Sequence, residues 1–249
     1  MRPRLTIARD QLAPTGTLRV GLNLANPLLI NRGADLSGPS GIAPDMAREL
    51  ARRLGVPVSF VPYETPGELA AAANADEWDV GLIGADPLRA AEISFTSAYL
   101  LIDATYLVPP GSPIRALDEV DREGVRIALF EGSAYDLYLR RTLRHATLRG
   151  ADSIEASFRI FASQGLEALA GLRPCLLAEQ ERMPGSRLLD GGFTAIQQAI
   201  GTPVGRTEGA EYLQHFVEDV VSEGLVGLRI GRNDVQGVTV AALGKSHFQ

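Results

Sequence analysis

An alternation of strand and helix signals constrains the fold of this chain most. Three short apolar runs, 18–24, 56–63 and 79–84, are rich in the β-branched and aliphatic residues typical of strands. Between them lie 44–54 and 65–74, which have helical periodicity. This order predicts α/β units built on a mainly parallel sheet.

The first two predicted helices carry recognisable end signals. Pro44 suits a first helical turn, and Gly55 suits the position just after a helix end. Thr65 and Glu68 have the spacing of a capping box, in which each side chain binds the backbone amide of the other residue. Both helices are therefore bounded by local sequence.

A second α/β unit is expected after the breaker cluster 109–113. It begins with a buried strand at 125–130, followed by a helix that extends to about Arg144. Asp152 and Glu155 again have capping-box spacing and predict a helix start. The remaining expected elements are a short helix at 166–170, strands at 175–178 and 194–201, and a final helix at 208–223.

Two chain crossings, near 101–108 and 196–202, are expected to join two lobes. Lobe 1 is predicted to comprise residues 17–104 and 200–249, and lobe 2 residues 105–199. The outline is that of a hinged molecule.

Composition excludes several classes of partner. A net charge of −6 argues against a nucleic-acid partner, which normally requires a concentrated basic surface. The single cysteine, Cys175, rules out an internal disulfide and a cysteine-based metal cage. His145, His215 and His247 lie far apart and lack a metal-ligand spacing. We therefore expect no metal and no cofactor.

The N-terminal segment gives no signal for export. No stretch approaches the length of a membrane span, and residues 1–18 lack a continuous apolar region followed by a cleavage site. If Met1 is the true start, the sequence predicts a cytoplasmic protein.

Arg89 is the strongest candidate for ligand binding. It lies shortly after Gly84, where a predicted strand ends and a helical turn begins at Pro87. Ligands of open α/β sheets bind at the carboxyl ends of strands. A guanidinium there can hold a carboxylate through two parallel charge-assisted hydrogen bonds. The alternative is a surface ion pair between Arg89 and Asp86 or Glu92.

Gly132 and Ser133 form a second candidate site, because they open a helix directly after a strand. Backbone amides at such a turn favour anions. Ser133 is also an ordinary N-cap residue, and the two roles are compatible.

Four blocks of sequence resemble the family 3 extracellular solute-binding proteins, the polar amino-acid receptors of ABC importers. The blocks are LRVGLNLANPLL at 18–29, GIAPDMARELARRLGVPVSFVPY at 41–63, WDVGLIGADPLRAAEISFTSAY at 78–99 and GVRIALFEGSAYDLYL at 124–139. They follow the family's order, and the likeness covers about 18–225.

The resemblance implies a two-lobed fold of the type II periplasmic binding protein kind. Each lobe would be a mainly parallel sheet flanked by helices, and two hinge crossings would join the lobes. It also implies that Arg89 binds a carboxylate and that the turn at Gly132 and Ser133 contacts the ligand from the other lobe. The implied partners are a small-molecule carboxylate or amino acid and the membrane component of an ABC transporter. The implied state is a monomer in the periplasm.

The chain departs from the family pattern at three places. The segment from Gly84 to Arg89 is compressed and contains an acid, Asp86, and Asn26 stands near the position of a family aromatic residue. Our alignment places Glu179 where the family has its amine-binding aspartate. An α-amino acid and a carboxylate without an amine both fit this pattern. The expected ligand-binding residues are Arg89, Gly84, Asp86, Asn26, Ser133, Gly132 and Glu179.

Two other function classes compete with a non-catalytic receptor. One is an enzyme on the same fold, a lyase resembling cyclohexadienyl dehydratase, with Asp86, Glu131 or Glu179 as its general acid. The other is a cytoplasmic ligand-sensing module that binds a partner protein. No acid–base pair or nucleophile stands out by spacing, so we expect no catalysis.

Overall fold

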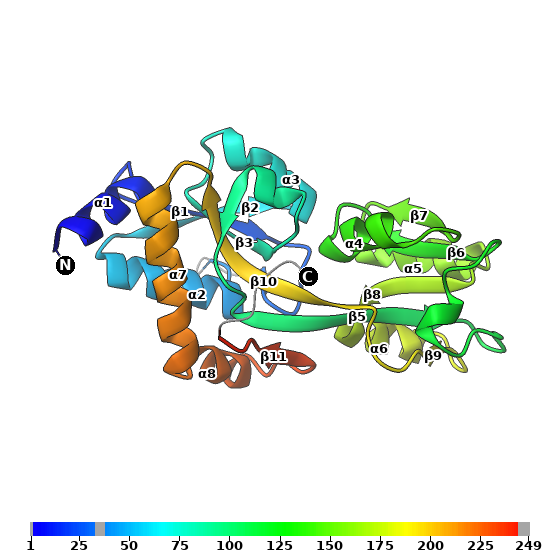
Figure 1. Ribbon diagram of the computed structural model, residues 1–249. Coiled ribbons are helices and arrows are strands. Elements are labelled where there is room, and N and C mark those ends of the chain that lie inside the picture. Colours follow the sequence, from blue (N-terminus) through cyan, green and yellow to red (C-terminus); the bar gives the residue numbers. More distant parts are fainter. Residues whose placement is uncertain (1, 33–37, 244–249) are drawn as a thin grey trace. The chain divides into compact units, whose positions relative to one another are not determined.

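The computed structural model describes residues 2–32 and 38–243 (Figure 1). The chain forms two compact units: unit 1 comprises Met1–Leu101 and Gln197–Gln249, and unit 2 comprises Ile102–Ile196. The chain passes between the units within β5 (Leu100–Val108) and within β10 (Thr194–Pro203). Each unit is described by itself below.

The sheet of unit 1 is parallel at its centre. Strand β1 lies between β2 and β3 and runs parallel to both, while β10 pairs antiparallel with β3 and also with β4. The α/β character expected from the sequence is therefore confirmed. The elements of unit 1 outside the two crossing strands are α1 (Arg2–Leu12), β1 (Leu18–Asn23), α2 (Ile42–Leu54), β2 (Val58–Tyr63), α3 (Pro66–Ala71), η1 (Ala72–Asn74), β3 (Val80–Gly84), η2 (Arg89–Ala91), β4 (Ile93–Phe95), α7 (Thr207–Ser222), α8 (Leu225–Arg232) and β11 (Val238–Val240).

The predicted helix ends of unit 1 are confirmed. Gly55 follows α2 with a φ of 69°, a left-handed conformation that glycine adopts without a steric penalty. At the start of α3, the Glu68 amide donates to the Thr65 hydroxyl at 3.1 Å, and the Thr65 amide donates to the Glu68 carboxylate at 3.2 Å. This is the reciprocal capping box.

Trp78 anchors the core on which β1 and β3 lie. Its side chain is fully buried, and its indole N–H donates to the Leu69 carbonyl at 3.1 Å. The strands pass close to the ring at Gly21, where an added Cβ would lie 3.3 Å from the indole. The indole thus fixes the spacing between α3 and the sheet that carries the candidate site.

Unit 2 repeats the parallel arrangement. Strand β6 lies between β7 and β8 and runs parallel to both, and β5 pairs antiparallel with β8 and β9. Phe158 and Phe161 of α5 fill its core together with Leu107 and Leu176. The elements between the two crossing strands are η3 (Leu117–Glu119), β6 (Arg126–Phe130), α4 (Ala134–Thr142), β7 (Thr147–Ala151), α5 (Ile154–Ser163), β8 (Ala168–Leu172), α6 (Arg173–Arg182) and β9 (Arg187–Leu188).

Two predictions in unit 2 were wrong: a helix followed by a strand was expected, whereas the structure has a strand followed by a helix. The segment expected as a short helix at 166–170 overlaps strand β8 (Ala168–Leu172), and the strand expected at 175–178 lies within helix α6 (Arg173–Arg182). Every residue of β8 is buried, and the strand pairs with β5 on one side and with β6 on the other. Pairing on both sides stabilises the extended conformation of this segment. Pro174 occupies the first turn of α6, where proline is pre-set for a helix.

Two further features of the fold differ from the sequence prediction. Helix α5 is capped by Ser153, whose hydroxyl accepts from the Ala156 amide at 3.1 Å, and not by Asp152. The N-terminal segment forms helix α1, which packs against α7 (Figure 1).

Within the described residues no helix combines the length and apolarity needed to cross a membrane.

Candidate functional site

Arg89 lies just after the carboxyl end of β3, in the short helix η2, and only 6% of its surface is exposed. Its Nη1 donates a hydrogen bond of 2.7 Å to the carbonyl of Gly84, the last residue of β3. Burial lowers the pKa of Arg89 to about 10, while the nearby charge of Asp86 favours the protonated form. The guanidinium therefore keeps its positive charge at neutral pH.

Asp86 lies in the turn between Gly84 and Arg89, with only 2% of its surface exposed. Its carboxylate accepts from the Leu88 amide at 2.9 Å, and its carbonyl accepts from the Ala90 amide at 3.0 Å. These two bonds shape the compressed turn that precedes Arg89. Because Arg89 and Asp86 are both buried, these two residues do not form an ion pair on the surface.

The end of β3 is held in place by β10. Gln198 lies opposite Gly84 in the antiparallel pair, and the Ala85 amide donates to the Gln197 carbonyl at 2.8 Å. The strand that carries the chain back into unit 1 thus supports the backbone beneath Arg89.

Asn26 follows β1, the strand next to β3, and is 7% exposed. Its side-chain oxygen accepts from the Leu28 amide at 3.2 Å, and its carbonyl accepts from the Ile30 amide at 3.1 Å. Because parallel neighbours end at the same edge of a sheet, Asn26 and Arg89 both follow that edge. The structure therefore brings the unit 1 candidates to one end of one sheet.

The turn at Gly132 and Ser133 follows β6 of unit 2, as expected. The Ser133 hydroxyl caps α4 by accepting from the Asp136 amide at 3.1 Å. In return, the Gly132 amide donates to the Asp136 carboxylate at 2.8 Å. Asp136 is 1% exposed, and its burial raises the pKa of its carboxyl group. Sequence reasoning missed Asp136, although its position three residues after an N-cap serine was the available signal.

Glu179 lies within α6 and not after a strand, because α6 replaces the predicted strand. Its carboxylate accepts from Arg182 Nη1 at 2.7 Å, and burial raises the pKa of Glu179 against the opposing effect of Arg182. The same Arg182 pairs with Glu155. A small pocket inside unit 2 is lined by residues that include Tyr135, Ser157, Cys175 and Glu179.

The family of this chain follows from a match to a known family model. Residues 18–232 match the model of the bacterial extracellular solute-binding proteins, family 3. The chain belongs to this family. The resemblance seen in the four sequence blocks is thereby confirmed.

Solved structures confirm the fold of this solute-binding protein. A mutant of ArgBP from T. maritima is 20% identical, with a TM-score of 0.73, and the match covers 91% of this chain and 99% of that one. An ancestral amino acid-binding protein, described as a precursor of cyclohexadienyl dehydratase, is 21% identical with a TM-score of 0.73 over 90% and 98% of the two chains. A putative ABC transporter binding component from Wolinella succinogenes DSM 1740, complexed with lysine, is 19% identical with a TM-score of 0.74 over 89% and 97%. No curated protein sequence matches the chain.

The single cysteine and the described histidines of this solute-binding protein differ in their exposure. Burial, with a smaller effect of the Glu179 charge, raises the pKa of the Cys175 thiol to about 11. His145 and His215 are exposed, and His247 lies outside the described residues. Among the described residues no group of three histidine, cysteine, aspartate or glutamate side chains is placed to hold a metal ion.

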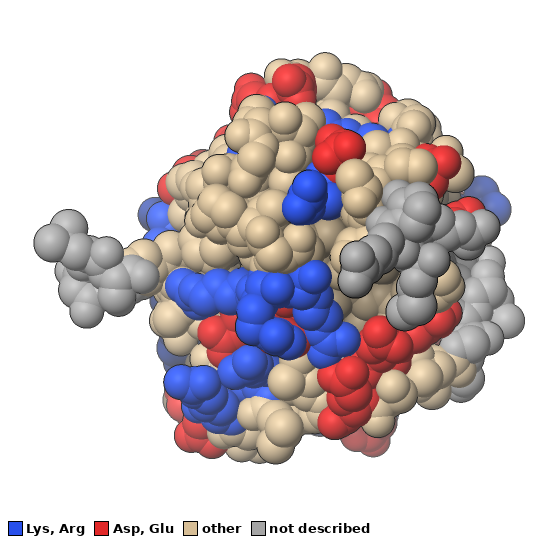
Figure 2. Space-filling view, turned by 90° about the vertical axis from the view of Figure 1, so that its left-hand side faces the viewer, with Lys and Arg blue, Asp and Glu red and all other residues tan. Residues whose placement is uncertain are grey.

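Charges of both signs lie beside one another on the face of the molecule shown in Figure 2. Within unit 1, Arg53 of α2 pairs with Glu49 at 2.7 Å and with Glu223 at 2.6 Å. Arg52 also pairs with Glu49, at 2.7 Å. Both arginines are thus engaged in ion pairs with carboxylates of unit 1.

Proposed function

We propose that this solute-binding protein binds a small carboxylate-bearing solute, an amino acid or a related organic acid, and releases it unchanged to an ABC transporter. The observation that carries the proposal is the buried guanidinium of Arg89 at the carboxyl end of β3. Removing a positive charge from water is costly, and a carboxylate ligand offsets that cost through paired hydrogen bonds.

Membership of a solute-binding family supports the same function, as do structural relatives whose names refer to amino acid binding or to bound lysine. The other candidate contacts in this proposal are Gly84, Asp86 and Asn26 of unit 1, together with Gly132, Ser133 and Glu179 of unit 2. We propose that Asp86 acts on the charge balance around Arg89 and that Asn26 shapes the neighbouring loop.

A thermal-shift screen tests the proposal. Its probes are L-arginine, L-lysine, L-glutamine and L-cysteine, each beside the matching acid that lacks the α-amine. Stabilisation that grows with ligand concentration is the expected result. Arg89→Ala should abolish it, whereas Arg52→Ala, which removes an exposed arginine of α2, should leave it unchanged. Equal stabilisation in the wild type and Arg89→Ala would contradict the proposal.

A lyase function is the second candidate, and a specific residue favours it. Asp86 is a buried carboxyl group beside Arg89, and a buried acid in a ligand site is a candidate proton donor. Turnover of prephenate or arogenate by the wild type, lost in Asp86→Asn, would replace the receptor proposal with the enzyme. Binding of the screened solutes without turnover would exclude it.

A further inference from the structure

Helix α1 lies outside the stretch that matches the family, which begins at residue 18, yet it is built into unit 1. Ala8 and Leu12 of this helix are 2% and 0% exposed. Leu12 packs directly on α7: an added Cβ at Gly209 would lie 3.0 Å from the Leu12 side chain. The side chains of Ala8 and Leu12 thus belong to the buried core of unit 1.

Gln11 caps helix α7 from a different helix. Its side-chain oxygen accepts from the Gly209 amide, in the first turn of α7, at 2.7 Å. Its side-chain nitrogen donates to the Glu208 carboxylate at 2.9 Å. The first amides of a helix have no partner within the helix, and a side-chain acceptor normally comes from the N-cap residue. In α7 the acceptor comes instead from Gln11, a residue of helix α1.

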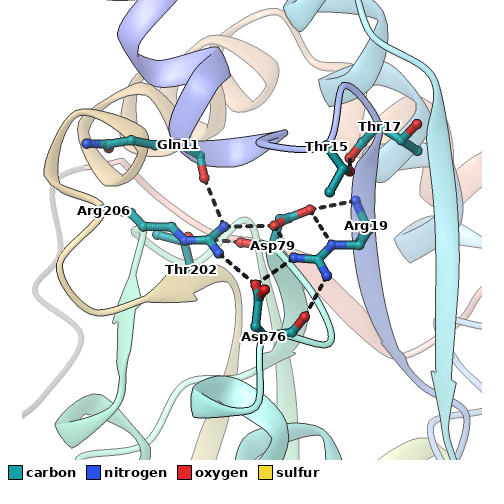
Figure 3. A network of polar contacts seen from close by, with 8 residues as sticks. All are labelled: Gln11, Thr15, Thr17, Arg19, Asp76, Asp79, Thr202 and Arg206. Carbon is teal, nitrogen blue, oxygen red and sulfur yellow. Dashed lines mark hydrogen bonds and ion pairs between the residues drawn. The ribbon is translucent and has the colours of Figure 1, made fainter.

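The backbone at the end of α1 takes part in a network of polar contacts centred on Asp79 (Figure 3). Arg206, just before α7, donates to the Gln11 carbonyl at 2.9 Å and to the Asp79 carboxylate at 2.9 Å. Asp79 is fully buried and also accepts from the side chain and the amide of Arg19 on β1. One buried carboxylate thus ties together α1, β1 and the segment that leads into α7.

We propose that α1 is a permanent structural part of unit 1, and that the working form of this protein retains residues 2–12. Without α1, the Gly209 amide and Arg206 would each lose an acceptor, and the surface of α7 beneath Leu12 would be exposed. Loss of a helix cap and exposure of apolar surface are both costly, so removal of α1 would destabilise the start of α7. Any processing of the N-terminus therefore leaves α1 in place.

Helix α1 is connected to the candidate site through Arg206, Asp79 and β10. Thr202, near the end of β10, donates to the Asp79 carbonyl at 2.9 Å. The same strand pairs with β3 at Gly84. Helix α1 and strand β10 are thus both joined to Asp79, one through Arg206 and the other through Thr202.

The first test is the intact mass of the protein recovered from the cells that naturally make it. The expected mass includes residues 2–12. A mature chain that begins at or after Pro14 would overturn the proposal.

The second test is amide hydrogen exchange of the recombinant chain, read at Gly209. Loss of a helix cap should speed exchange there roughly tenfold in Gln11→Ala. Asp10→Ala is the matched control, because Asp10 is exposed on the same helix, and it should leave exchange at Gly209 unchanged. Equal exchange in the two variants would show that Gln11 does not cap α7 and would overturn the proposal.

Discussion

The guanidinium of Arg89 donates a 2.7 Å hydrogen bond to the carbonyl of Gly84, the residue at which β3 ends. This bond orients a charged side chain along the edge of the sheet, and β10 holds the backbone on which it depends. The orientation of the arginine is thus set by main-chain geometry. We expect ligand binding to depend on the shape of this side chain as well as on its charge.

Arg89→Lys tests that expectation. Lysine keeps the charge but cannot present the planar fork of donors that matches a carboxylate. We expect it to weaken binding of a carboxylate solute substantially, although less than Arg89→Ala, for which roughly 2–5 kcal/mol is typical of a buried charge pair. Titration calorimetry with the best solute from the screen measures the loss. An Arg89→Lys variant that binds as tightly as the wild type would show that the fork is not used.

Trp78→Phe should destabilise unit 1. The substitution leaves the Leu69 carbonyl without its indole donor and opens space beside β1 and β3. The expected cost is about 1–3 kcal/mol in the free energy of unfolding. Urea unfolding followed by circular dichroism measures it. Leu228→Ala is the control, because Leu228 is 69% exposed and its truncation should change stability by less than about 0.5 kcal/mol.

Glu49 gives the stability of unit 1 a defined pH dependence. Hydrogen bonds from Arg52, together with those from Arg53, lower its pKa to about 2 from an ordinary value of 4.5. A depressed pKa in the folded state stabilises the fold above the unfolded value, and this stabilisation is lost as the pH falls towards 2. Glu49→Gln should therefore lower the urea midpoint at pH 7 and have little effect near pH 2.

The control for this pH dependence is Glu211→Gln, at an exposed position of α7. It should change the midpoint little at either pH. A Glu49→Gln effect of equal size at pH 7 and pH 2 would mean that the contribution of Glu49 does not come from its charge.

Local sequence was sufficient for helices α2 and α3 of unit 1 and failed at β8 and α6 of unit 2. The capping box at Thr65 and the glycine after α2 depend on residues within one helical turn, and the structure confirms both. Strand β8 and helix α6 are distinguished by pairing partners distant in sequence, which local periodicity does not report. The cap that Gln11 provides to α7 joins residues 198 positions apart, so no local sequence pattern predicts it.

The candidate site divides in the same way. Arg89, Asp86 and Ser133 follow strands, as the sequence predicted, because those strands are clearly marked in it. Glu179 lies in a helix and not after the predicted strand, so its ion pair with Arg182 one helical turn away was not predicted. Asp136 was missed because its role depends on the folded turn at Gly132.

Asp86→Asn tests how this protein distinguishes between solutes. The negative charge of Asp86 partly balances the positive charge of Arg89. Asp86 also repels the carboxylate of a solute that binds to Arg89. Asparagine keeps the oxygen that accepts from the Leu88 amide, which preserves the turn. Removing the charge should tighten binding of a carboxylate without an amine by roughly fivefold, and it should favour that acid over the matching amino acid. Calorimetry with both members of each solute pair measures the two affinities, and Glu92→Gln, at an exposed position nearby, is the control. If both members of a pair change equally, Asp86 does not discriminate between them, and recognition of an amine must come from another residue.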